Sequence, residues 1–237
     1  MKLGALIFSR FDSSRLPGKA LLDIHTRTLL GRVLDLTKRV SNIDEIIIAT
    51  TDREVDNVIE KFSDIEKVKI FRGNFKNVAL RAIDACECFG LDGFVRICGD
   101  RPFFDSDLVS QLAMMFKQND YDLVVTPHKK NIPAGLTAEV ISIDVLRDNI
   151  KYFMPPHEEH LTSYFYENAD SFNIKSIVPP KYITKDLNIR LVVDNKRDLE
   201  RARWIALNLN SNSVELCMSK IISLASNWET ENPTGFT

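Results

Sequence analysis

Short apolar runs alternate with amphipathic stripes over the first half of the sequence, and this alternation limits the fold more than any other feature. The pattern of a buried strand recurs at 2–8, 43–50, 67–71, 93–98 and 121–126. Between these runs, apolar residues follow the spacing of a helix at 28–40, 53–62, 75–89 and 105–118. Such an order predicts an α/β fold, with a mostly parallel sheet flanked by helices.

The rhythm changes after residue 126. A polar stretch that carries Pro133 and Gly135 comes first. Further strands are expected at 138–142, 173–178 and 189–193, and further helices at 143–152, 156–168, 196–208 and 214–225. We therefore expect a single domain over 1–237, with 127–180 as an inserted flap or dimerisation arm and 226–237 as a frayed tail.

A cationic loop follows the first expected strand. The segment 10–19 combines three cations and two hydroxyls, which are Arg10, Arg15, Lys19, Ser13 and Ser14. Pro17 and Gly18 interrupt regular structure, so the loop is expected at the carboxyl end of a strand, where open α/β sheets bind ligands. Its donors are suited to a polyphosphate, although a solvated basic loop is the alternative. The segment lacks the spacing of a P-loop.

Two aspartates are expected at the same edge of the sheet. Asp100 follows the strand 93–98, and Asp194 follows the strand 189–193. Mg²⁺ prefers oxygen ligands and is usually held by one or two carboxylates together with substrate phosphates. The alternative role for each aspartate is to cap a helix or a turn.

Composition narrows the binding partners and the cellular location that we expect for this protein. The 237 residues carry a formal net charge of −2, which argues against a general nucleic-acid binder. No apolar run approaches the roughly 18 residues of a membrane span, and no signal-peptide cleavage site follows the start, so we expect no membrane partner and a cytoplasmic location. The cysteines show no zinc spacing and are expected to be free thiols.

The segment S-R-F-D-S-S-R-L-P-G-K at 9–19 resembles the signature of the cytidylyltransferases that activate sugar acids, the CMP-Kdo and CMP-sialate synthetases. The whole chain is most similar to their relatives, the spore-coat-polysaccharide or SpsF-type cytidylyltransferases. Further segments keep the family's order, namely IIIATTD at 46–52, FRGNFKNVALR at 71–81, VRICGDRPFFD at 95–105, GLTAEV at 135–140, EEHLTSYFYEN at 158–168 and IRLVVDNKRDLE at 189–200.

The resemblance implies a GT-A-like Rossmann-type fold and Mg²⁺-dependent transfer of CMP from CTP to an acceptor, with release of pyrophosphate. It implies nucleotide binding by Arg10, Ser13, Ser14, Arg15, Lys19, Arg72, Asn77 and Asp100. Catalytic roles are expected for Lys19, Arg15 and Asp100, and metal binding for Asp100 and Asp194. The acceptor, a nonulosonic or Kdo-like sugar acid or a related compound, is expected near Arg81, Glu139, His160 and Thr162.

Three residues depart from the family pattern. Asp12 stands where relatives usually have a small residue, and it places a negative charge inside the phosphate loop. Pointing inward, Asp12 would weaken CTP binding; pointing outward, it would orient Arg10 or Arg15. Asn77 and Ala134 each replace an aspartate of the family, which leaves the acceptor open.

Two other functions stay open. The D-x-D at Asp105–Asp107 is a metal motif of glycosyltransferases that use nucleotide sugars, but it also matches a helix start with Asp105 as N-cap. A non-catalytic relative is the second alternative.

A stripe of large side chains, rich in aromatic residues, is expected on the helix 156–168, formed by Leu161, Tyr164, Phe165 and Tyr166. Aromatic residues are enriched in interface cores, and the synthetases that the chain resembles commonly dimerise through this region. We therefore expect a homodimer, with packing of the stripe on its own sheet as the alternative.

Overall fold

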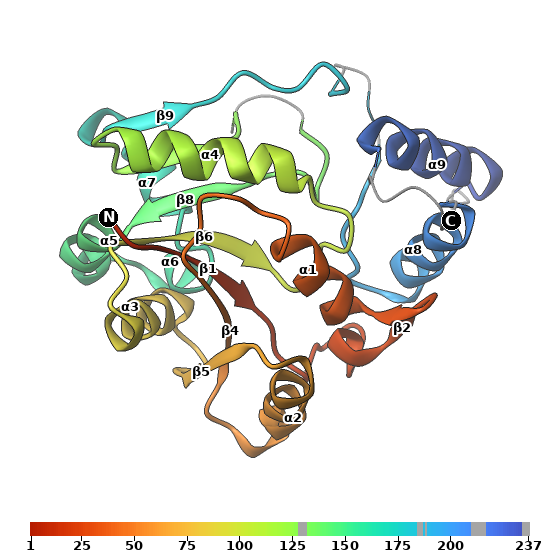
Figure 1. Cartoon of the computed structure of the whole chain (residues 1–237), viewed down its shortest axis with the longest axis horizontal. Helices are drawn as coiled ribbons and strands as arrows, with labels where there is room; N and C mark the ends of the chain where they lie inside the picture. Colours follow the sequence, from red (N-terminus) through yellow and green to blue (C-terminus); the bar gives the residue numbers. More distant parts are fainter. Residues whose placement is uncertain (128–131, 184–186, 188, 210–216, 234–237) are drawn as a thin grey trace.

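The computed structural model describes residues 1–127, 132–183, 187, 189–209 and 217–233. Within these ranges, seven strands form one sheet (Figure 1). Their order across the sheet is β5 (Lys69–Gly73), β4 (Glu45–Thr51), β1 (Leu3–Phe8), β6 (Gly93–Cys98), β8 (Glu139–Ser142), β7 (Leu123–Val125) and β9 (Ile174–Ser176).

The sheet is mostly parallel, as the alternation in the sequence predicts. β1 pairs in parallel with β4 and β6, and β4 pairs in parallel with β5. The exception is β8, which lies antiparallel between β6 and β7, while β9 runs parallel to β7. The change of rhythm after residue 126 therefore marks the point where the chain turns back to insert a strand.

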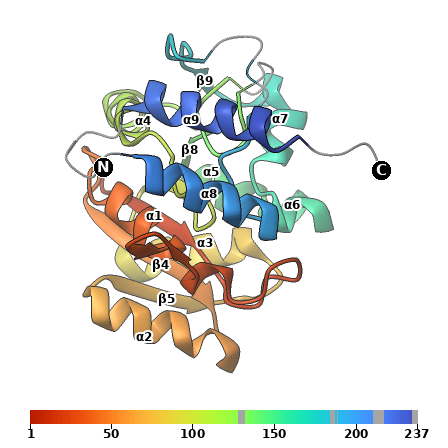
Figure 2. The ribbon, with the colours of Figure 1, turned by 90° about the vertical axis from the view of Figure 1, so that its right-hand side faces the viewer.

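Helices cover both faces of the sheet (Figure 2). One face packs against α1 (Leu29–Thr37), α2 (Asn57–Glu66) and α4 (Ser106–Gln118). The other packs against α3 (Val78–Phe89), α5 (Ile143–Asn149), α6 (Pro155–Glu159) and α7 (Ser163–Glu167). Side chains of β1 point alternately to the two faces. Leu3 and Ile7 pack in the core under α1, α2 and α4, and Leu6 packs in the core on the opposite face.

A third, smaller core lies at the carboxyl end of β1 and β6. It is built by α8 (Lys196–Asn208), α9 (Met218–Glu231) and the hairpin of β2 (Asp23–Ile24) and β3 (Arg27–Thr28). Short 3₁₀ turns complete the elements, at η1 (Lys19–Leu21), η2 (Glu54–Asp56), η3 (Ile150–Tyr152) and η4 (Ala169–Ser171).

The structure differs from the sequence expectations at three places in the second half. The expected helix 156–168 is two short helices that are interrupted at His160. The expected strand 189–193 is extended but forms only an isolated bridge between Ala134 and Arg190. The tail expected from 226 continues α9 to Glu231 and buries Trp228, while 234–237 and the first residues of the expected helix 214–225 lie outside the described residues.

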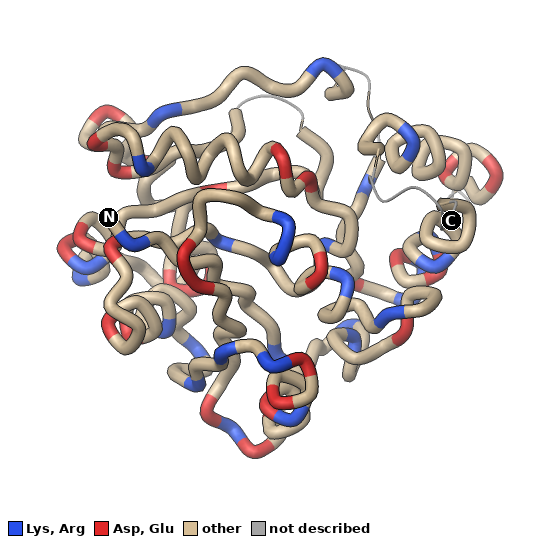
Figure 3. Tube along the Cα trace, in the orientation of Figure 1, with Lys and Arg blue, Asp and Glu red and all other residues tan. Residues whose placement is uncertain are grey.

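Charges and thiols complete the description. Lys and Arg are interspersed with Asp and Glu along the trace (Figure 3). Cys86, Cys88, Cys98 and Cys217 are free thiols, as expected. Among the described residues, none of the helices is both long and apolar enough to cross a membrane.

Candidate active site

The phosphate loop, which we define as residues 9–19, leaves the sheet where β1 and β6 end side by side. The backbone N–H of Gly99 donates to the carbonyl of Phe8 at 2.9 Å. A Cβ on Gly99 would lie 2.9 Å from that same oxygen, so this close approach of two chains requires glycine. The next residue, Asp100, is thereby placed beside the loop.

Lys19 joins the loop to both predicted metal ligands. Its Nζ donates to Asp100 Oδ2 at 3.1 Å and to Asp194 Oδ1 at 3.1 Å. It also donates to the carbonyl of Val193 at 2.8 Å, and its side chain is only 15% exposed. The structure therefore brings together Lys19, Asp100 and Asp194, as expected, although Asp194 follows a segment that is not a strand of the sheet.

Asp194 is surrounded by cations. Arg15 lies 3.2 Å from its Oδ1, and Arg190 contacts its other oxygen. Burial raises the pKa of Asp194, but Lys19, Arg15 and Arg190 outweigh burial and hold this pKa below its usual range. Arg190 was missed as a site residue, although it stands in the same family segment as Asp194.

The helix that follows fixes the backbone of Asp194. Asn195 caps α8, because its side chain accepts from the Asp198 N–H at 3.0 Å. The carboxylate of Asp198 in turn accepts from the N–H of Asp194 at 2.9 Å. The extended segment before it is held by the bond from Val193 N to Asp100 O at 2.9 Å.

The carboxylates of Asp100 and Asp194 fit a magnesium ion by their chemistry. Both are hard oxygen donors, and both converge on the same nitrogen of Lys19. Proteins usually bind Mg²⁺ with one or two carboxylates and leave the remaining positions to water and substrate phosphates. No group of three or more His, Cys, Asp or Glu side chains in the described ranges is arranged to hold a metal ion by itself.

The other half of the phosphate loop contacts the turn after β4. Asp12 forms two short hydrogen bonds with Arg53, at 2.6 and 2.7 Å, and Arg10 Nε lies 4.0 Å from Asp12. Ser13 is half-buried, while Ser14 and Arg15 are exposed. The loop thus offers exposed donors between two anchored ends.

Arg72 and Asn77 have structural partners. Arg72 donates to the carbonyls of Thr51 and Arg53, at 3.2 and 2.7 Å, and so supports the turn after β4. Asn77 caps α3 by accepting from the N–H of Leu80 at 2.8 Å. Nucleotide binding by either side chain stays a prediction.

A second polar site lies between strands β6 and β8 of the sheet and the segment 160–166. It is a cavity of about 230 Å³ lined by Arg96, Thr126, Thr137, Glu139, His160, Thr162, Ser163 and Tyr166. Three of the four predicted acceptor residues, Glu139, His160 and Thr162, therefore lie together. The fourth, Arg81, does not line this cavity; it is buried in α3, and burial lowers its pKa to about 10.

Glu139 organises the wall of this cavity. It stands opposite Arg96 across β6 and β8 and pairs with it at 2.9 Å. Its other oxygen accepts from the hydroxyls of Thr162 and Tyr166, each at 3.0 Å. Burial raises the pKa of Glu139, but Arg96 foremost, together with Arg101 and the hydroxyl of Tyr166, more than offsets burial and the pKa stays lowered. Arg96 was missed, although an arginine inside an apolar strand is a signal.

The D-x-D segment starts a helix. The side chain of Asp105 accepts from the N–H groups of Asp107 and Leu108 at 2.9 and 3.1 Å, so it is the N-cap of α4. Its second oxygen binds the hydroxyl of Tyr182. This geometry matches the helix-start interpretation of the motif.

Comparisons of the sequence and of the structure with known proteins agree on one family. A sequence model described as "Cytidylyltransferase" matches residues 5–213. The spore coat polysaccharide biosynthesis protein SpsF of Bacillus subtilis is 27% identical over 203 residues, which are 82% of each chain. A 3-deoxy-manno-octulosonate cytidylyltransferase of Fusobacterium nucleatum is 30% identical over 131 residues, covering 54% of this chain and 52% of its own. The structure of a cytidylyltransferase from Leptospira borgpetersenii superposes with a TM-score of 0.88 at 26% identity, covering 100% of both chains.

Proposed function

Because this chain belongs to the cytidylyltransferase family, we propose that it transfers CMP from CTP to a sugar acid, nonulosonic or Kdo-like, and releases pyrophosphate. The observation that carries the proposal is the junction at Lys19, where the phosphate loop meets Asp100 and Asp194. Cations and carboxylates at one sheet edge are the two sets of groups that a metal-assisted nucleotidyl transfer needs.

In the proposed reaction, an acceptor oxygen bonds to the α-phosphorus of CTP while the bond to the β-phosphate oxygen breaks. Arg10, Arg15 and Lys19 bind the triphosphate and stabilise the negative charge that the leaving pyrophosphate gains. Asp100 and Asp194 would hold Mg²⁺, which, when bound, adds positive charge against the phosphate oxygens. The hydroxyls of Ser13 and Ser14 orient further phosphate oxygens.

The cavity beside β8 is the proposed acceptor site. Its walls carry the hydroxyls of Thr126, Thr137, Thr162 and Tyr166, which are suited to a polyhydroxylated compound. The name of the Fusobacterium relative supports a sugar acid, and that of the Bacillus relative supports a role in surface polysaccharide biosynthesis.

Pyrophosphate release tests the proposal. The four nucleoside triphosphates are screened with Mg²⁺ against a panel of sugar acids, sugar phosphates and neutral sugars, with Asp100→Asn as the inactive control. We expect release with CTP that depends on a sugar acid. Hydrolysis of a UDP-sugar would instead favour a glycosyltransferase, and absence of CTP binding together with absence of turnover would favour a non-catalytic relative.

The homodimer and the cytoplasmic location stay predictions. Leu161 and Phe165, from the stripe that motivated the dimer, are fully buried in their own core, so they are not available to a partner. Tyr152 and Met154 of the same arm are 58% and 62% exposed, and we propose this surface for a symmetric contact. Light scattering should give about twice the chain mass of 27.0 kDa.

A further inference from the structure

Asp12 lies inside the phosphate loop, where an unopposed carboxylate would repel a triphosphate and compete for the loop's cations. Two nearby residues of this segment, Arg10 and Ser13, are both proposed to bind phosphate. Its side chain is 37% exposed, so burial alone does not keep it from the ligand. The structure supplies a partner for this charge from outside the loop.

Arg53, in the turn after β4, binds Asp12 through both arms of its guanidinium. Nη1 donates to Oδ2 at 2.6 Å and Nη2 donates to Oδ1 at 2.7 Å, the bidentate geometry that fixes both groups in direction. These hydrogen bonds are the main reason that the pKa of Asp12 is lowered. The carboxylate of Asp12 is therefore ionised and is paired with the guanidinium of Arg53.

The position of Arg53 is fixed by groups other than Asp12. Its Nε donates to the Thr51 hydroxyl at 3.1 Å, and its Nη2 lies 3.3 Å from the buried carboxylate of Asp56. Its guanidinium carbon lies 3.5 Å from the ring centre of Phe75, and its carbonyl accepts from Arg72 at 2.7 Å. Arg53 is therefore a rigid support for the loop.

Arg10 lies against the same support. Its guanidinium carbon is 5.5 Å from the ring centre of Phe75, and its Nε is 4.0 Å from Asp12. The neighbouring Phe11 N–H donates to Asp56 at 2.7 Å, which fixes the backbone between Arg10 and Asp12. The direction of Arg10 is thus set by an aromatic ring, a carboxylate and a backbone anchor.

We propose that Asp12 and Arg53 form a positioning pair, which holds the first half of the phosphate loop and directs Arg10 toward the triphosphate of CTP. The inference rests on the proposed function and names residues that act through Arg10 without touching the reacting atoms. Because Arg53 binds both oxygens of Asp12 while Arg10 Nε stays 4.0 Å from this carboxylate, the donors of Arg10 are left for the phosphates. Removal of Arg53 alone leaves a carboxylate that attracts Arg10 and repels the phosphates.

A double-mutant cycle tests the pair, with the Kd of CTP measured by titration calorimetry and the KM values of CTP and acceptor measured separately. Arg53→Ala should raise the Kd of CTP about tenfold or more, because it leaves Asp12 unopposed. In the double variant, Arg53→Ala with Asp12→Ala, the Kd of CTP should be at least about threefold lower than in Arg53→Ala alone, because the repelling carboxylate is gone. The acceptor KM should stay within about twofold, since the cavity beside β8 is unchanged.

A purely structural role predicts the opposite order, in which the double variant binds CTP no better than Arg53→Ala, and this result overturns the inference. Arg53→Lys keeps the charge but loses the two-armed contact, and it should fall between wild type and Arg53→Ala. A wild-type protein that binds no CTP overturns the proposed function as well. Wild-type binding without rescue in the cycle overturns the positioning pair alone.

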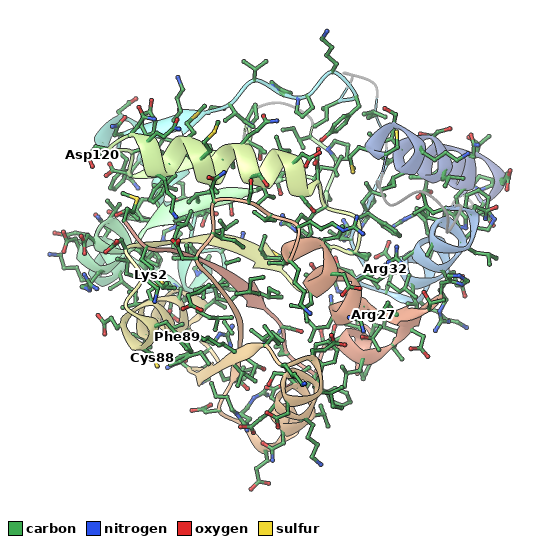
Figure 4. The ribbon with its side chains drawn as sticks, in the orientation of Figure 1. Lys2, Arg27, Arg32, Cys88, Phe89 and Asp120 are labelled. Carbon is green, nitrogen blue, oxygen red and sulfur yellow. The ribbon has the colours of Figure 1, made fainter. Side chains whose placement is uncertain are left out.

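Arg27 offers a matched control (Figure 4). It makes an equally ordered pair with Asp35, at 2.9 and 2.8 Å, and a further contact with Glu66 at 2.6 Å, all outside the phosphate loop. Arg27→Ala should lower the free energy of unfolding while the Kd of CTP stays unchanged. An increase in Kd equal to that of Arg53→Ala would show general destabilisation and overturn the inference.

Discussion

Arg201 donates to the carboxylate of Asp198 at 2.6 Å, and these two side chains are only 4% and 3% exposed. The same carboxylate accepts from the backbone N–H of Asp194, while Arg201 also reaches Glu229 of α9 at 2.8 Å. The C-terminal helix is therefore linked through two ion pairs to the backbone of a predicted metal ligand. Trp228 lies against this link, because its ring centre is 5.7 Å from the Arg201 guanidinium carbon.

Arg201→Ala should destabilise the fold strongly. The variant leaves the carboxylate of Asp198 buried without its main partner, and breaking a buried pair in this way costs about 3–5 kcal/mol. The free energy of unfolding in urea measures the effect. Arg147→Ala, which removes a 42% exposed arginine paired with Glu87, is the control and should change stability by about 1 kcal/mol or less. Equal losses in the two variants would contradict the role of Arg201.

Asp100→Asn and Asp194→Asn should each abolish nucleotidyl transfer while the fold stays intact. Both changes keep the shape of the side chain but remove the charge that is proposed to hold Mg²⁺. Pyrophosphate release with CTP and acceptor measures turnover, and circular dichroism checks the fold. Chelation of divalent ions should have the same effect on the wild-type enzyme. Full turnover by Asp100→Asn that still requires the metal ion would remove Asp100 from the metal site.

Lys19→Ala should lower the affinity for CTP or the turnover by about tenfold or more, the equivalent of roughly 1.4 kcal/mol of phosphate stabilisation. Lys2→Ala is the matched control, because Lys2 precedes β1 whereas the phosphate loop follows it (Figure 4). Lys2 donates to the carbonyl of Phe89 at 2.8 Å, and its removal should leave CTP binding unchanged. A CTP titration of Lys19→Ala that matches the wild type would contradict the assignment.

Local patterns predicted the sheet edge that carries the candidate site. The apolar runs that became β1 and β6 are buried strands; Gly99 marks the end of β6, and Pro17 and Gly18 mark the loop that follows β1. Since parallel strands end at one edge, the sequence predicted a common edge for Lys19 and Asp100. That β1 and β6 are neighbours, which lets the two side chains meet, is seen only in the structure.

Long-range pairing was beyond such patterns. Asp12 and Arg53 are 41 residues apart, and Arg96 and Glu139 are 43 apart, so nothing local shows which charges meet. The interruption at His160 also has no glycine or proline to announce it. Leu161 and Phe165, which follow it, are both fully buried in the same core, but their spacing would also fit a continuous helix, and nothing in the part of the chain that the structure describes explains the break. Propensity alone predicts one continuous helix there.

Glu139→Gln should destabilise the protein at neutral pH more than at acid pH. The pKa of Glu139 is lowered from its ordinary value of 4.5, so folding favours its ionised form. This contribution is fully present above the ordinary pKa and is lost as the pH falls through the lowered one. The variant leaves Arg96 without its charged partner, so we expect a loss of about 3 kcal/mol or more near pH 7 that shrinks below about pH 4.

Urea unfolding of both proteins between neutral and acid pH measures this difference. Glu159→Gln, at an exposed position of the arm, controls for the change in net charge. Because Glu139 also holds Thr162 and Tyr166, the same variant should raise the acceptor KM and leave the Kd of CTP unchanged. If the stability difference between wild type and Glu139→Gln does not change with pH, the carboxylate contributes through its shape. That result would contradict a stabilising charge pair between Glu139 and Arg96.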